Sequence, residues 1–88
     1  MEGHFFIFYY IMINMESKIK IGTYKHFKGH NVKVLGMAKN SENYEEEFVV
    51  YIHPHDGHDQ MWIRPIGMFL ENVERDDYNG PRFEYIGE

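Results

Sequence analysis

Aromatic rings alternate with cationic side chains at two places in this sequence, and such a pairing can bind a flat anion. Trp62 and Arg64 are two residues apart, so on a β-strand both side chains would lie on one face. Tyr24, His26 and Lys28 alternate in the same way. An aromatic ring can stack on a flat ligand, while a guanidinium binds a phosphate or carboxylate through two parallel hydrogen bonds. We therefore expect these side chains to contribute to a binding site.

Four more residues extend the candidate site. Tyr51 lies on a predicted middle strand and can close the same patch, and Arg82 beside Phe83 repeats the cation–aromatic pairing. Asn40 and Glu42 flank a predicted turn, where an amide and a carboxylate can bind ribose hydroxyls or an exocyclic amine. The predicted ligand-binding residues are Tyr24, His26, Lys28, Asn40, Glu42, Tyr51, Trp62, Arg64 and Arg82.

Each of these groups also has a purely structural interpretation. Trp62 can cover one end of a core while Arg64 pairs with a carboxylate such as Glu42 or Glu84. The alternating Tyr, His and Lys can form a half-buried face whose lysine reaches water. Asn, Ser and Glu at residues 40–42 are good turn formers in their own right. The sequence leaves both interpretations open.

A histidine-rich loop spans residues 53–59 and holds three imidazoles and two carboxylates. Such groups can bind zinc, nickel or copper. The spacing argues against a metal site, because Pro54 interrupts the strand and Asp56–Gly57 favours a turn immediately afterwards. We predict no metal and no cofactor, with His53, His55 and His58 as weak candidate ligands.

Composition argues against an enzyme and against a duplex DNA binder. The 88 residues carry 9 Lys and Arg against 14 Asp and Glu, a net charge of −5, and no cysteine. No Ser or Thr stands in a nucleophile motif, and no glycine-rich phosphate loop is present. The charge is unevenly spread, since residues 16–39 are basic and residues 40–88 are acidic. A basic face can bind a small anion, or the two halves can simply pair across a sheet.

The first fourteen residues differ from the rest. Phe5–Ile13 is an unbroken apolar run of nine residues, too short for a membrane span, and it lacks the basic region and cleavage site of a secretory signal. We expect residues 1–14 to be either a leader added by an upstream start, with Met15 beginning the domain, or an extra β-strand or oligomer contact. Residues 15–88 then form one small domain, which we expect to be cytoplasmic.

The remaining sequence is typical of a mainly β domain. Turn signals at Lys28–Gly29, Asp56–Gly57 and Asn79–Gly80 separate short apolar runs. Pro65 opens one helical turn over Ile66–Leu70. We predict a single five-stranded, SH3-like antiparallel barrel with that helical turn before the last strand. The expected strands are Thr23–Lys28, Val32–Asn40, Phe48–His53, Met61–Arg64 and Arg82–Ile86.

From Gly22 onward, several blocks of this sequence resemble a known family. They are Gly22-x-Tyr24-x-His26-Phe27-Lys28-Gly29, Ala38-x-Asn40-Ser41-Glu42, Val49-Val50-Tyr51, Trp62-x-Arg64-Pro65-x-x-Met68-Phe69 and Pro81-Arg82-Phe83. The family comprises short bacterial and phage proteins known only as a domain of unknown function. The resemblance implies a compact SH3-like β fold and brings no established reaction. The apolar leader and the histidine-rich loop lie outside the pattern.

These observations favour a non-catalytic protein that binds a small anionic, nucleotide-like ligand, and in a phage it would sequester a signalling nucleotide. A shallow groove on a small barrel favours completion of the site by a second subunit, so we expect a homo-oligomer. A protein- or peptide-interaction module of the SH3-like type is the alternative. A single-stranded nucleic-acid binder is the third possibility, which the acidic C-terminal half disfavours.

Overall fold

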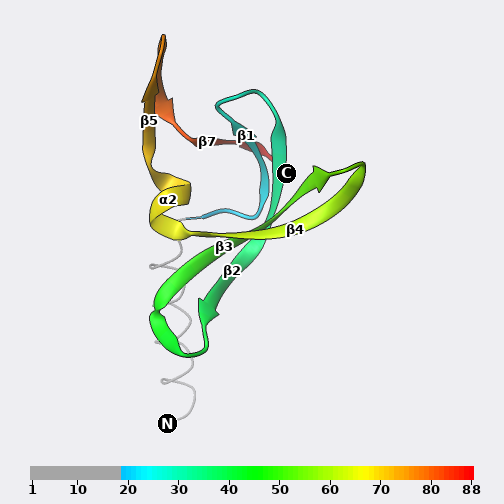
Figure 1. The fold of residues 1–88 in the computed structure, drawn as a ribbon, viewed down its shortest axis with the longest axis vertical. Coiled ribbons are helices and arrows are strands. Elements are labelled where there is room, and N and C mark those ends of the chain that lie inside the picture. Colours follow the sequence, from blue (N-terminus) through cyan, green and yellow to red (C-terminus); the bar gives the residue numbers. More distant parts are fainter. Residues whose placement is uncertain (1–18) are drawn as a thin grey trace.

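A computed structural model describes residues 19–88, and the predicted leader at residues 1–14 lies outside the described residues. These described residues form seven strands and one short helix, and Figure 1 shows their arrangement. In chain order these are β1 (Gly22–His26), β2 (Asn31–Asn40), β3 (Asn43–His55), β4 (His58–Pro65), α2 (Ile66–Leu70), β5 (Asn72–Arg75), β6 (Tyr78–Pro81) and β7 (Phe83–Gly87). No helix in this part of the chain is long and apolar enough to cross a membrane.

Five of the strands form one antiparallel sheet in the order β4-β3-β2-β1-β7. The five predicted strands correspond to these five, so the mainly β, antiparallel prediction is confirmed. The predicted closed barrel is not found, because β4 and β7 are the two edges of the sheet and do not pair with each other. β5 and β6 form a separate hairpin that projects from the end of α2 (Figure 1).

One predicted turn is confirmed and another is corrected. Asp56 and Gly57 both have positive φ, 53° and 79°, and they join β3 to β4 as a two-residue hairpin turn of the predicted kind. The turn predicted at Asn79–Gly80 is wrong, because both residues lie in β6. The chain instead reverses at Asp76, whose φ is 49°, a conformation that Asp tolerates better than most residues do.

Apolar alternation on β2 and β3 buries one face of the sheet. Val34 and Val49 are fully buried near the middle of these strands. A register shift between Val34 and Gly36 marks a bulge in β2, and bulges bend a strand and increase its twist. Together these strands supply the centre of the core, which comprises Ile19, Tyr24, Val32, Val34, Val49, Tyr51, Phe69 and Phe83.

The helix α2 closes this core from one side. Pro65 ends β4 and precedes the helix, and Phe69 is the buried residue of its single turn. The Phe69 ring stacks on Phe83 of β7, with centroids 4.2 Å apart and an interplanar angle of 5°, and meets Tyr24 edge-on at 5.3 Å. One short helix therefore holds β1 and β7 against the rest of the sheet.

Replacing the Phe69 ring should destabilise the fold strongly. Its side chain is 1% exposed, and Phe→Ala at such a site costs about 3–5 kcal/mol through lost burial and the cavity left behind. We expect Phe69→Ala to lower the free energy of unfolding in urea by about that amount. Leu70→Ala is the matched control on the same helical turn, because Leu70 is 45% exposed. Equal losses in the two variants would contradict this account of the core.

Candidate functional site

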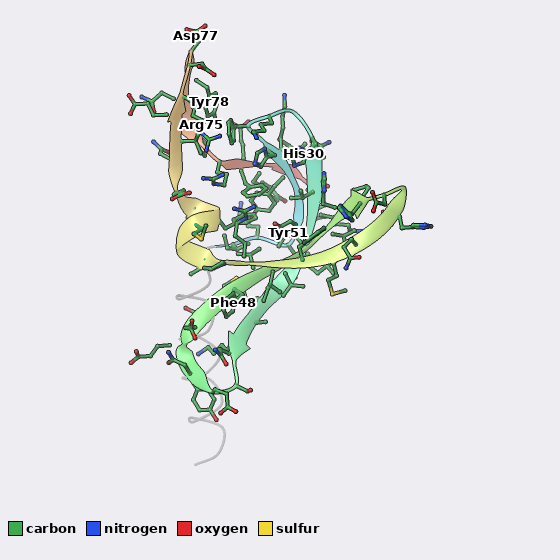
Figure 2. All side chains as sticks on the ribbon, in the orientation of Figure 1. His30, Phe48, Tyr51, Arg75, Asp77 and Tyr78 are labelled. Carbon is green, nitrogen blue, oxygen red and sulfur yellow. The ribbon has the colours of Figure 1, made fainter. Side chains whose placement is uncertain are left out.

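The main candidate site is a cavity of about 400 Å³ in front of the buried face of the sheet. Its walls come from β1 and the turn after it, from β2, β3 and β4, and from the hairpin β5–β6. In Figure 2, Tyr51 lies on β3 and His30 lies just before β2, while Arg75 comes from the hairpin. The lining residues are His26, Lys28, His30, Val32, Tyr51, His53, Trp62, Arg64, Arg75, Arg82 and Phe83.

Four permanent cations line this cavity, and no carboxylate does. They are Lys28, Arg64, Arg75 and Arg82. Glu71 lies at the end of α2 and binds Arg82 from outside the lining, with distances of 2.5 Å to Nη2 and 3.2 Å to Nε. One of the four charges is therefore compensated in the protein itself. The other three leave the cavity strongly positive.

The ring of Phe27 lies beneath three of these cations. Lys28 Nζ, Arg75 Cζ and Arg82 Cζ lie 6.0, 5.8 and 6.0 Å from its centroid. The negative face of an aromatic ring attracts cations at such distances. Phe27 also stacks at 5.5 Å on Tyr78 of β6, so it connects the turn after β1 to the hairpin that carries Arg75.

Trp62 and Arg64 project together from β4, as the spacing predicts. Trp62 of β4 lies opposite Tyr51 of the neighbouring strand β3. Its indole N–H donates a hydrogen bond to the His53 carbonyl oxygen at 3.1 Å. Arg64 Nε donates to the Tyr51 hydroxyl at 3.4 Å, and its guanidinium lies 5.6 Å from the centre of the Phe83 ring. These contacts fix both side chains at the cavity while Trp62 remains 37% exposed.

Three imidazoles lie side by side in the wall of the cavity; we call His26, His30 and His53 the imidazole stack. The rings of His26 and His30 are nearly parallel, with centroids 4.4 Å apart, and those of His30 and His53 are 4.3 Å apart. His26 is buried, and its Nδ1 accepts a hydrogen bond from the backbone N–H of Lys28 at 3.1 Å. In neutral His26 the ring proton therefore resides on Nε2.

Two members of the stack, His26 and His30, are held in their neutral forms. Burial, followed by the charges of His30, Arg82, Arg64 and Lys28, lowers the pKa of His26 to about 4. Burial, His53 and Lys28 lower the pKa of His30 as well. The nearby positive charges disfavour a protonated histidine, and the same charges would favour an anion placed at that point.

Comparison with known proteins identifies the family. The profile of the family described as "Protein of unknown function (DUF1653)" matches residues 22–85. The chain belongs to the DUF1653 family. The resemblance found in the sequence is thus confirmed, together with its lack of an assigned reaction.

A crystal structure of a DUF1653 protein from Bordetella bronchiseptica is similar to this chain. The two share 32% sequence identity with a TM-score of 0.69, and the match covers 80% of this chain and 90% of the other. No match was found among curated proteins. These relationships support the fold of this DUF1653 protein without naming its ligand.

Six of the nine predicted site residues line the cavity. They come from separate stretches of the chain, and they are His26, Lys28, Tyr51, Trp62, Arg64 and Arg82.

Three predicted site residues lie elsewhere. Tyr24 is buried in the core, and its hydroxyl binds the backbone N–H and carbonyl of Lys20 at 2.9 and 2.8 Å. Burial raises the pKa of this hydroxyl. Asn40 and Glu42 lie at the exposed turn between β2 and β3, where the Asn40 side chain accepts from the Glu42 backbone N–H and donates to Glu46. None of these three residues lines the cavity.

Sequence reasoning missed part of the lining. Arg75 reaches the cavity only because the β5–β6 hairpin folds beside the turn after β1, and no local pattern indicates this. His30 follows His26 by four residues, and the turn between them brings the two rings together, a signal that could have been used. Val32, His53 and Phe83 complete the set of unpredicted lining residues.

The histidine-rich loop does not gather its imidazoles. His53 belongs to the cavity wall, whereas His55 lies against Trp62 at 5.5 Å and 3.5 Å from the Asp56 carboxylate. His58 pairs with His55 across the hairpin turn. Among residues 19–88 no group of three or more His, Cys, Asp or Glu side chains is arranged to hold a metal ion.

The low pKa of His26 predicts that the protein loses stability in acid. The folded state keeps His26 neutral down to about pH 4, whereas the unfolded chain takes up a proton below its ordinary value of 6.5. The unfolded state therefore binds more protons between these values, and stability falls as the pH falls through this range. With about 1.4 kcal/mol per pKa unit, the free energy of unfolding should drop by roughly 3 kcal/mol from this residue.

Urea unfolding at several pH values measures the effect. His26→Gln should flatten the dependence between pH 6.5 and 4, while His58→Gln, on the exposed hairpin, should leave it as in the wild type. Parallel curves for the wild type and His26→Gln would show that His26 does not contribute.

Proposed function

We propose that this DUF1653 protein is a non-catalytic module that binds a small anionic, nucleotide-like ligand in the cavity described above. The observation that carries the proposal is the charge of the lining, four permanent cations with no carboxylate. A protein with a net charge of −5 concentrates nearly half of its nine Lys and Arg residues at this one place. Desolvated guanidinium groups bind phosphate and carboxylate groups strongly and with defined geometry.

The nucleotide-like part of the proposal is supported by Trp62. Its indole is anchored through the His53 carbonyl and still partly exposed at the cavity, so a flat ring can stack on it. Tyr51 is less suited to stacking than the sequence suggested, because it is buried and its hydroxyl accepts from Arg64. A volume of about 400 Å³ lies within the usual range of roughly 300–1,000 Å³ for small-molecule sites.

A binding role is favoured over a catalytic one by the chemistry of the lining. Among the described residues, those that line the cavity include no Ser, Thr or Cys nucleophile and no carboxylate that could serve as a base. His26 is neutral, but its Nδ1 already accepts a backbone hydrogen bond. We further propose that a second copy of the chain completes the site and that the ligand is sequestered rather than converted.

Removing the side chains of Trp62 and Arg64 should abolish ligand binding without unfolding the sheet. Trp62 and Arg64 lie on an edge strand and are only partly buried. We expect the double variant Trp62→Ala, Arg64→Ala to lose binding of adenosine 5′-monophosphate and 5′-diphosphate by at least about 30-fold, because each group contributes about 1–3 kcal/mol. Isothermal titration measures the affinity, and circular dichroism checks the fold.

Lys39→Ala is the matched control, since it removes one positive charge from exposed β2 outside the cavity. Native mass spectrometry of the untagged wild type reports the number of subunits and any co-purified molecule. If no anionic molecule co-purifies and neither nucleotide binds, the proposed function is wrong. If the double variant unfolds, these side chains are structural and the site assignment to them fails.

A peptide-interaction module is the second candidate, and β4 favours it. This strand is an edge of the sheet, and Met61 and Ile63 are 58% and 61% exposed on the face opposite Trp62 and Arg64. An extended peptide can add to such an edge through backbone hydrogen bonds.

Salt dependence separates the candidates. Binding through Arg64, Arg82 and Lys28 should weaken markedly between low and physiological ionic strength, whereas apolar peptide binding at β4 should not. Titrations of the nucleotides at two salt concentrations provide the measurement. A mixed-sequence oligonucleotide in the same series tests the third class of ligand, single-stranded nucleic acid. Nucleotide affinity that is independent of salt would contradict the cationic site.

A further inference from the structure

The imidazole stack is a group of titratable side chains at the same place as the permanent cations. His30 is its middle member, in contact with the ring of His26 on one side and that of His53 on the other. All three line the cavity. A neutral imidazole can offer an anion only a hydrogen bond. An imidazole that takes up a proton when the anion binds adds a positive charge to the site.

Imidazoles and permanent cations surround His30, and no carboxylate lines the cavity beside it. His26 faces it from β1, His53 from β3 and Lys28 from the turn. The other charged or titratable side chains of the cavity are Tyr51 of β3, Arg64 of β4, Arg75 of β5 and Arg82 before β7. Outside the lining, Glu71 binds Arg82, and Asp76 and Asp77 share a neighbouring cavity with Lys28 and Arg75. Beyond His26, a separate small cavity holds Lys25 and Glu84.

Hydrogen bonding decides which imidazole can accept a proton. In neutral His26, Nε2 carries the proton and Nδ1 accepts from the Lys28 backbone N–H. A second proton would have to enter at Nδ1, where it would replace this hydrogen bond by a contact between two donors. His30 is more exposed than His26 and lies beside the ligand space. His30 is therefore the better proton acceptor of the two.

We propose that a dianionic group, the phosphate of a nucleotide-like ligand, enters this cavity together with one proton that is taken up by His30. The inference rests on the proposed function and deepens it, because it specifies the charge of the ligand and couples binding to pH. Only His30 changes protonation, and no covalent bond forms or breaks.

The charges of the cavity explain why a dianion would bind and why His30 would then take up a proton. With Glu71 set against Arg82, the cavity keeps about three positive charges, enough for a dianion and more than a carboxylate needs. A negative charge within about 4–6 Å raises the pKa of a histidine by about 1–3 units. Burial, His53 and Lys28 hold the pKa of His30 low in the empty site. An incoming dianion cancels the contribution of those charges, so protonation becomes favourable only when the ligand is bound.

Inorganic sulfate is a suitable probe, because it remains a dianion at every pH of the experiment while phosphate itself titrates. Trp62 is the single tryptophan of the chain and lines the cavity, so its fluorescence reports binding. We expect the affinity for sulfate to rise as the pH falls from about 7.5 to 5.5, approaching tenfold per pH unit, the limit for one coupled proton. Titration calorimetry in two buffers of different ionisation enthalpy should show proton uptake.

His30→Asn keeps a neutral polar side chain at this position and removes the proton acceptor. Its affinity for sulfate should therefore rise far less between pH 7.5 and 5.5 than that of the wild type, whatever its affinity at pH 7.5. His58→Asn removes a histidine from the exposed hairpin outside the cavity and should keep the full pH dependence.

The outcomes separate this inference from the proposed function. Sulfate binding whose affinity does not change with pH, or an equal pH dependence in His30→Asn, would overturn the proton coupling and leave the anion site in place. Nucleotides that bind while sulfate fails at every pH would overturn the dianion assignment alone. Proton-coupled sulfate binding with no nucleotide affinity would support the inference and contradict only the nucleotide-like part of the proposed function.

Discussion

The stacked pair Phe69–Phe83 is the contact on which both the fold and the site depend. Phe69 comes from the single helical turn and Phe83 from the last strand, and their rings lie 4.2 Å apart within 5° of parallel. The sheet is open, with β4 and β7 as edges, so its buried face needs a cover from another element. Phe69 supplies that cover. Phe83 belongs both to the core and to the cavity lining, and Arg64 lies over the Phe83 ring.

Because core and cavity share Phe83, the position of the cations follows from packing. Arg64 is held between the Phe83 ring and the Tyr51 hydroxyl, and Tyr51 itself belongs to the core. His26 meets Phe83 edge-on at 5.0 Å. Core residues therefore hold Arg64 and His26 in place at the cavity.

Local charge differs in sign from the charge of the whole chain. The net charge is −5, yet the cavity collects Lys28, Arg64, Arg75 and Arg82, and among the described residues only Arg82 of these four forms an ion pair, with Glu71. Other acidic residues lie at the turn between β2 and β3 and along exposed positions of β5 to β7. Exposed charges farther away than about 10 Å are largely screened by salt, so the local arrangement decides what the cavity attracts.

The local pattern of the sequence was enough to predict the five main strands and several members of the site. Alternation on strands depends only on the two-residue period of the backbone, so it correctly placed Trp62 with Arg64 on one face of β4. The Asp56–Gly57 turn followed from the φ values that these residues tolerate. The family, too, was identifiable from short blocks of residues.

Only the tertiary structure decided which side chains meet and which do not. Tyr24 shares a strand face with His26, but α2 covers Tyr24 with Phe69 and leaves His26 at the cavity. Arg75 joins the site because a separate hairpin folds beside Phe27. The closed barrel was not predictable from local sequence for a similar reason. Whether the two edge strands of a sheet pair depends on the curvature and twist of the whole sheet. Local sequence specifies strand faces and turns, whereas contacts between distant segments are set by packing.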